Sequence, residues 1–189
     1  MRETLSGAEG RDGLSFVEEM NEFEKDRIEF VDKYCGLLHL STDDPGFNEA
    51  VKAYHRAAST SPRIERVTTA LYLYRAALES ENVRAHFILL LLVVDRLFSP
   101  GLRGKVLIRN LREKIGKVLR EEVPEWVTAD YRNRNRMLYG TTRTDNLDIK
   151  FLRDEVCVRW RHLLRKLLRE ILVRNKVRLF ASTKSLKKL

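Results

Sequence analysis

The chain of 189 residues lacks the features that mark several classes of protein. Its two cysteines, Cys35 and Cys157, form neither a disulfide framework nor a CxxC pair. Its longest unbroken apolar run is the eight residues 87–94, whereas a helix needs about 20 to span a bilayer. Residues 1–13 carry acids and no apolar core, so they do not resemble a secretory signal. We therefore expect a soluble, cytoplasmic protein with no membrane partner.

Motifs for the common cofactors and metals are absent too. The sequence contains no GxxxxGK[ST], GxGxxG, GxSxG or HExxH pattern. Its four histidines, His39, His55, His86 and His162, are scattered, and no two have the spacing of helical metal ligands. The prediction is a protein with no cofactor and no metal.

Strand signals are also nearly absent, because no stretch alternates apolar and polar residues between turn residues. Only four prolines and nine glycines occur, and they fall where helical periodicity breaks. The pattern predicts an all-α bundle of about five main helices. These are expected over 62–79, 81–98, 103–122, 124–139 and 147–177. The helix over 81–98 is apolar nearly all round and is expected to lie at the centre.

The same pattern divides the chain into four parts. Residues 1–13 are polar and predict a disordered tail. An acidic helical arm is expected over 14–60, with a turn at 41–46 before a short second helix. The helical bundle covers 61–178, and a basic tail covers 179–189.

Charge is distributed unevenly along the chain. Residues 1–100 hold 12 Lys and Arg against 17 Asp and Glu, a net charge of −5, whereas residues 101–189 hold 24 against 10, a net charge of +14. A strongly basic half suggests a face that meets a polyanion such as RNA, although a solvated surface gives the same composition. The basic residues of the last helix also fit either RNA contact or a solvated surface. They are Arg159, Arg161, Arg165, Lys166, Arg169, Arg174, Lys176 and Arg178.

The segment 130–140 carries the most specific signal, DYRNRNRMLYG. Helical spacing places Arg132, Asn135, Arg136 and Tyr139 on one polar stripe. Arg134 lies off this stripe, on the side of two apolar residues. A partly inward arginine needs a carboxylate partner, and Asp95, which follows the apolar run 87–94, is the first candidate. Glu79 and Glu81 are the alternatives.

This segment resembles the signature of the HEPN superfamily, an arginine and a polar residue followed by histidine after four to six residues. Arg134, Asn135 and Tyr139-Gly140 match the form found in Apea-like HEPN domains, with tyrosine in place of the histidine. Residues 70–78 resemble the helix that opens such domains. Residues 87–97 resemble the central helix, with Asp95 at its acidic position. The resemblance covers about 62–175.

The resemblance implies an RNA-binding protein, and a metal-independent endoribonuclease of the toxin or phage-defence type. In such enzymes two motif helices meet across a homodimer, and cleavage leaves 2′,3′-cyclic phosphate ends. It assigns Arg134, Asn135 and Tyr139 to catalysis and Asp95 to orienting the arginine. Arg132, Arg136 and Arg143 would bind RNA.

Two other interpretations stay open. Tyrosine has an ordinary pKa near 10 and is a poor base at neutral pH, so the domain could be a catalytically inactive module for dimerisation and RNA docking. Alternatively, the chain is a helical protein-interaction protein whose acidic arm docks on a basic surface. A toxin would have an antitoxin as its partner, whereas an interaction protein would have another protein.

Overall fold

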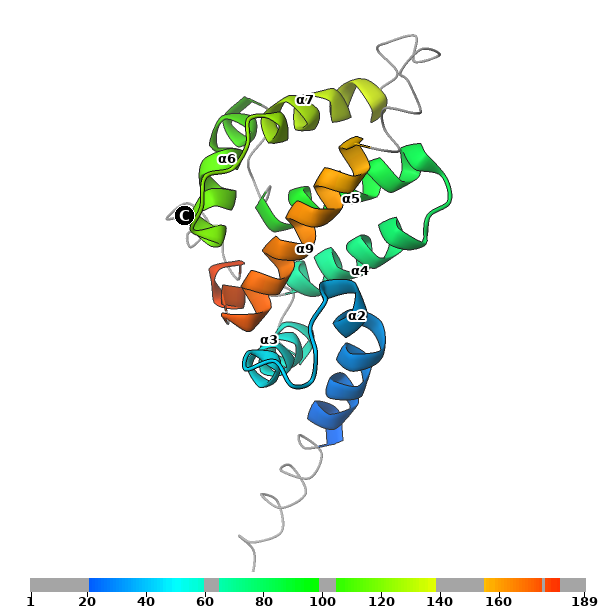
Figure 1. Ribbon diagram of the computed structural model, residues 1–189, viewed down its shortest axis with the longest axis vertical. Helices are drawn as coiled ribbons and strands as arrows, with labels where there is room; N and C mark the ends of the chain where they lie inside the picture. The colour runs from blue at the N-terminus through cyan, green and yellow to red at the C-terminus, as the bar shows by residue number, and fades with distance from the viewer. Residues whose placement is uncertain (1–20, 60–64, 99–104, 139–154, 175, 181–189) are drawn as a thin grey trace, which may run out of the picture.

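The computed structural model describes residues 21–59, 65–98, 105–138, 155–174 and 176–180, which Figure 1 draws in colour. Side chains at 105–109 and 133–138 are not described. Within these ranges every regular element is helical, which confirms the predicted all-α class. Residues 21–30 form a helix that continues into a π-helical turn, η1 (Val31–Cys35). The elements that follow are α2 (Gly36–Leu38), α3 (Phe47–Ser59), α4 (Glu65–Glu79), α5 (Val83–Phe98), α6 (Lys105–Leu119), α7 (Trp126–Leu138), α9 (Cys157–Val173) and the 3-10 turn η4 (Lys176–Phe180).

The predicted helices over 62–79, 81–98, 103–122 and 124–139 correspond to α4, α5, α6 and α7. The turns between them follow local chemistry. Asn82 caps α5, because its side-chain oxygen accepts a hydrogen bond from the backbone N–H of Ala85 at 3.0 Å. In the predicted turn at 41–46, the Asp44 carboxylate accepts a hydrogen bond from the Ser41 N–H at 2.8 Å. The HEPN-like arrangement of the bundle stays a prediction.

Helix α9 crosses the other helices diagonally (Figure 1) and contacts α2, α3, α4, α5, α6 and η4. Helices α4 and α5 form a closely packed pair beneath it. Helices α6 and α7 lie on one side of this pair, and α2 and α3 lie on the other (Figure 1). As expected from its apolar run, α5 is surrounded, with α4, α6, α7 and α9 packed around it. This arrangement packs α7 against α5.

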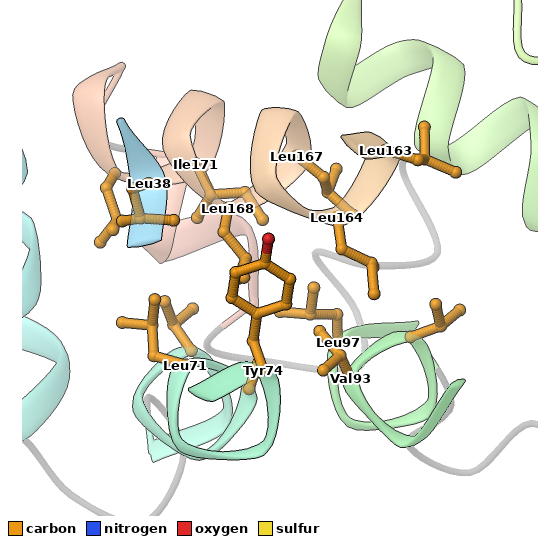
Figure 2. Packing of buried hydrophobic residues seen from close by; sticks show 14 of the residues in the cluster. Leu38, Leu71, Tyr74, Val93, Leu97, Leu163, Leu164, Leu167, Leu168 and Ile171 are labelled. Carbon is orange, nitrogen blue, oxygen red and sulfur yellow. The ribbon is translucent and has the colours of Figure 1, made fainter. Parts of the chain in front are cut away.

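The core forms where α9 meets α4 and α5. Leucines and an isoleucine of α9 point toward Leu71 and Tyr74 of α4 and Val93 and Leu97 of α5 (Figure 2). Tyr74 stands upright in this layer, with its hydroxyl directed at α9. The hydroxyl donates a hydrogen bond of 3.2 Å to the backbone carbonyl of Arg161, which satisfies a polar group in an apolar layer.

The amino-terminal helices pack into the same core. Phe30, Tyr34 and Tyr54 are buried, and the ring centroids of Phe30 and Tyr54 lie 5.4 Å apart. Helix α3 packs against both α4 and α9. Residues 21–59 therefore share one hydrophobic core with the bundle, while the predicted division at residue 60 lies outside the described residues.

The prediction of one continuous helix over 147–177 is wrong at its carboxyl end. Helix α9 ends at Val173, and the chain turns at Arg174 into η4. The turn buries Val177 and Phe180, and the Phe180 ring meets Phe98 edge-on at a centroid distance of 5.7 Å. A straight helix would carry these side chains past the end of α5, so apolar burial ends the helix here. The predicted basic tail from 179 thus begins inside η4.

Two glycines provide a test of this packing. Gly36 has helical angles, and a Cβ there would have no neighbour within 4 Å. We expect Gly36→Ala to raise the free energy of unfolding by about 0.5–1 kcal/mol, because alanine loses less backbone entropy in a helix. A Cβ on Gly46 would lie 2.2 Å from Cγ1 of Val173, so Gly46→Ala should cost about 1–3 kcal/mol by forcing α3 away from α9.

Urea denaturation of the two alanine variants measures both effects. Because each variant adds one methyl group, each serves as the control for the other. Equal changes in the two variants, of either sign, would contradict the packing of α3 against the end of α9.

Candidate functional site

The candidate site lies on α7, which a buried ion pair fixes to α9. Asp130 on α7 is only 6% exposed. Its carboxylate accepts hydrogen bonds from Arg159 Nε at 3.0 Å and Arg159 Nη2 at 2.6 Å, and from Trp160 Nε1 at 3.0 Å. A buried carboxylate is tolerated when several donors satisfy it, and here three donor groups do so.

Two tryptophans enclose this ion pair. The Arg159 guanidinium lies over the Trp126 ring, with its carbon 4.7 Å from the ring centroid. The Trp126 and Trp160 rings meet edge to face, 5.3 Å apart at an angle of 82°. Trp160 is fully buried. The cluster therefore fixes the first half of α7 rigidly on the start of α9.

A second contact joins α7 to α5. The Tyr131 hydroxyl donates a hydrogen bond to Oδ1 of Asp95. This contact provides a partner for the carboxylate that the sequence marks as needing one. The predicted pairing of Asp95 with Arg134 concerns a side chain outside the described residues, and it stays a prediction. The alternative Glu79 accepts a hydrogen bond from Arg75 at 2.7 Å on the surface of α4.

The structure describes only some of the predicted site residues of the segment 130–143. Arg132 is exposed on α7, two residues beyond Asp130. The backbones of Arg134, Asn135 and Arg136 belong to the last turns of α7, but their side chains are not described. Tyr139 and Arg143 both lie outside the described residues.

The eight basic residues over 159–178, which lie in α9, at Arg174 and in η4, fall into two groups. Five of them form an ion pair with a carboxylate. The interpretation of these residues as a solvated surface did not predict such pairs. These pairs are Arg159–Asp130, Lys166–Glu121, Arg169–Asp44, Arg174–Glu170 and Lys176–Glu170. Among the described residues, no carboxylate lies within ion-pair distance of Arg161, Arg165 or Arg178. Much of the positive charge over 159–178 is therefore neutralised within the fold, whereas the charges of Arg161 and Arg165 in α9 are not.

Both cysteines are buried and have free thiols. Burial raises the pKa of the Cys157 thiol to about 11, so it stays protonated at neutral pH. Burial lowers the pKa of His86, and its hydrogen bonds to backbone groups of Ala77 and Ser80 oppose that shift. Within the described ranges, no group of three or more histidines, cysteines or acids is placed to hold a metal ion. In the same part of the chain, no helix has the length and apolar character to cross a membrane.

In comparisons with protein-family models, curated proteins and solved structures, no match to this chain was found. The resemblance to HEPN domains thus stays a prediction based on residues 70–97 and 130–140.

Sequence reasoning missed the residues that fix α7. Asp130 was visible as the only acid between Glu125 and Asp145, inside a segment rich in arginine. An isolated acid beside a tryptophan on a helix is a signal for a buried pair. Its partner could not be identified, because Arg159 is 29 residues away, in a run of equally plausible cations.

Proposed function

We propose that this chain binds RNA through the carboxyl-terminal half of α7 and cleaves the bound strand without a metal ion. What supports the proposal is the combination of the arginine-rich segment 132–136 with the firm attachment of the helix that carries it. The Asp130–Arg159–Trp160 contacts hold α7 two residues before Arg132, and Arg132 is exposed. A helix fixed in this way needs no further ordering of its backbone when RNA binds.

The chemistry assigned to this end of α7 comes from the resemblance. Arg134 would contact two oxygens of the scissile phosphate, since a guanidinium presents its donors in a planar fork. The 2′-hydroxyl of the ribose attacks phosphorus and gives its proton to water, and the bond to the 5′ oxygen breaks, which leaves a 2′,3′-cyclic phosphate. Tyr139 donates a proton to the leaving 5′ oxygen, and Asn135 hydrogen-bonds the phosphate. Arginine thereby offsets the charge that develops on phosphorus.

The functional unit is proposed to be a homodimer. In the related domains the two motif helices meet, so each cleft uses residues of both copies. The same surface would be blocked by an antitoxin or other inhibitory protein. The fixed position of α7 suits such pairing, because a rigid helix forms an interface at little entropic cost.

The test is incubation of the purified protein with mixed RNA in EDTA, followed by end-group analysis. We expect cleavage that leaves 2′,3′-cyclic phosphate ends, and we expect Arg134→Ala to slow it at least about 100-fold, as for loss of one transition-state donor. Arg174→Ala removes a surface cation that is paired with Glu170, and it should cleave like the native chain. Cleavage that survives Arg134→Ala, or that requires magnesium, would contradict the proposal.

The inactive-module alternative rests on Tyr139 in the position of the expected histidine. If the native chain binds RNA but does not cleave it, Tyr139→His should create cleavage in the same assay. Binding that persists with no cleavage by either form would favour the docking module over the enzyme.

A further inference from the structure

A hollow of about 310 Å³ lies between α2, α4 and α9. Its lining residues belong to these elements and to His39, and none of them belongs to α7. Its polar lining consists of His39, Arg161, His162 and Arg165, and its apolar lining includes Tyr74 and Leu78. All four polar residues are basic. A hollow that combines a few converging polar groups with apolar walls is the usual form of a small-molecule site.

Arg165 is the centre of this lining. Its Nη1 lies 2.7 Å from Nε2 of His39, and its Nη2 lies 2.5 Å from Nδ1 of His162. Both imidazoles accept from the guanidinium, so neither neutralises its charge. The next basic residues along α9, Lys166 and Arg169, are paired with Glu121 and Asp44. Among the described residues, the neighbouring cations of α9 therefore have carboxylate partners, whereas Arg165 has none.

Arg161 carries a second charge at the same place. It has no carboxylate partner among the described residues, and it lines both this hollow and a neighbouring one of about 260 Å³. The second hollow also contains His86, whose buried Nε2 atom has no hydrogen-bond partner within the described part of the chain. A buried nitrogen without a partner is uncommon in a folded protein and calls for an explanation such as a bound group.

The backbone presents His39 to α9 in an unusual conformation. His39 has a φ of 51°, in the left-handed region that non-glycine residues seldom adopt. The π-helical turn η1 comes directly before α2 and His39. Single π-helical turns and left-handed residues occur often at functional sites, where a side chain must point in one required direction.

From these observations we propose that the hollow between α2, α4 and α9 binds a phosphate monoester through Arg161, Arg165, His39 and His162. Guanidinium groups and imidazole N–H groups are the donors that phosphate oxygens accept best. The hollow is large enough for the phosphate and a small organic group, which would lie against Tyr74 and Leu78. This inference does not depend on the proposed cleavage of RNA, because it uses none of the residues of α7.

The monoester could come from a free nucleotide or from the terminal phosphate of an RNA strand. Isothermal titration calorimetry with AMP, inorganic phosphate and adenosine measures the recognition of phosphate. We expect the full chain to bind AMP more tightly than inorganic phosphate and not to bind adenosine. Two oligoribonucleotides, one with a 5′-phosphate and one with a 5′-hydroxyl, distinguish the two sources. If the site recognises the end of an RNA strand, the chain binds the 5′-phosphorylated strand more tightly; if it recognises a free nucleotide, it binds both strands equally.

Arg165→Ala and His162→Gln should each weaken AMP binding at least tenfold. Lys166→Ala is the matched control, because it removes a charge from the adjacent position of α9, where the lysine is already paired, and it should bind AMP like the native chain. Circular dichroism establishes that each variant is folded, and His162→Gln keeps the test valid if Arg165→Ala does not fold.

Two results would overturn the inference. One is binding of AMP only at tens of millimolar, or equal binding of adenosine. The other is an equal loss of AMP affinity in Lys166→Ala, which would show a general effect of charge. Neither result bears on α7, whose arginines are intact in all of these variants.

Discussion

Asp130→Ala is expected to lower the free energy of unfolding by about 3 kcal/mol, the low end of the range for breaking a buried ion pair. Its carboxylate is 8% exposed, and it is the acceptor for Arg159 and for the indole N–H of Trp160. Removing it leaves a guanidinium and a buried N–H without that acceptor. Because the Arg159 side chain is 28% exposed, water recovers part of the loss, which is why we expect the low end of the range.

Urea denaturation at neutral pH measures this effect, with two control variants. Glu121→Ala breaks the surface pair with Lys166 and should cost no more than about 0.5 kcal/mol. Asp130→Asn keeps an acceptor for Trp160 but loses the charge, so it should fall between the two, near 1–2 kcal/mol. If the free energies of unfolding of Asp130→Ala and Glu121→Ala agree within experimental error, the buried pair does not hold α7 in place.

The second large effect concerns RNA. Replacing Arg132 and Arg136 together by alanine should weaken binding of single-stranded RNA by about tenfold to a hundredfold at 0.1 M salt, on the order of 1 kcal/mol for each lost phosphate contact. The matched control is Lys166→Ala with Arg169→Ala, which removes two positive charges that are paired with Glu121 and Asp44. Both double variants have the same net charge, so a difference between them locates the RNA surface.

Much of the fold could be predicted because it follows from local spacing. The apolar stripe of 62–79 and the all-apolar run 87–94 predict α4 and α5, and the turn residues at 41–46 predict the break before α3. The end of α9 could not be predicted in this way. Val177 and Phe180 leave the helix to reach a core that includes Phe98, which is 82 positions from Phe180. Local periodicity carries no information on such a contact.

The candidate site shows the same limit. The sequence marks Asp95 as an acid that needs a partner, and the Tyr131 hydroxyl is one. The sequence does not show which cations are neutralised, because Arg169 meets Asp44 across 125 positions and Lys166 meets Glu121 across 45. The basic charge of the last helix is therefore much smaller in effect than its composition indicates. The hollow lined by Arg161 and Arg165 becomes visible only once these pairs are known.

The most direct test of the central claim is the salt dependence of RNA binding by the native chain and by the Arg132/Arg136 double variant. Fluorescence anisotropy with a labelled single strand gives the association constant from about 50 to 200 mM salt. We expect the logarithm of the constant to fall linearly with the logarithm of the salt concentration, with a slope near −2 to −3 for the native chain. The slope of the variant should be shallower by about 1–2, since each phosphate contact on a single strand contributes about 0.7. Absence of RNA binding at the lowest salt, or identical slopes for the two proteins, would contradict the assignment of RNA binding to α7.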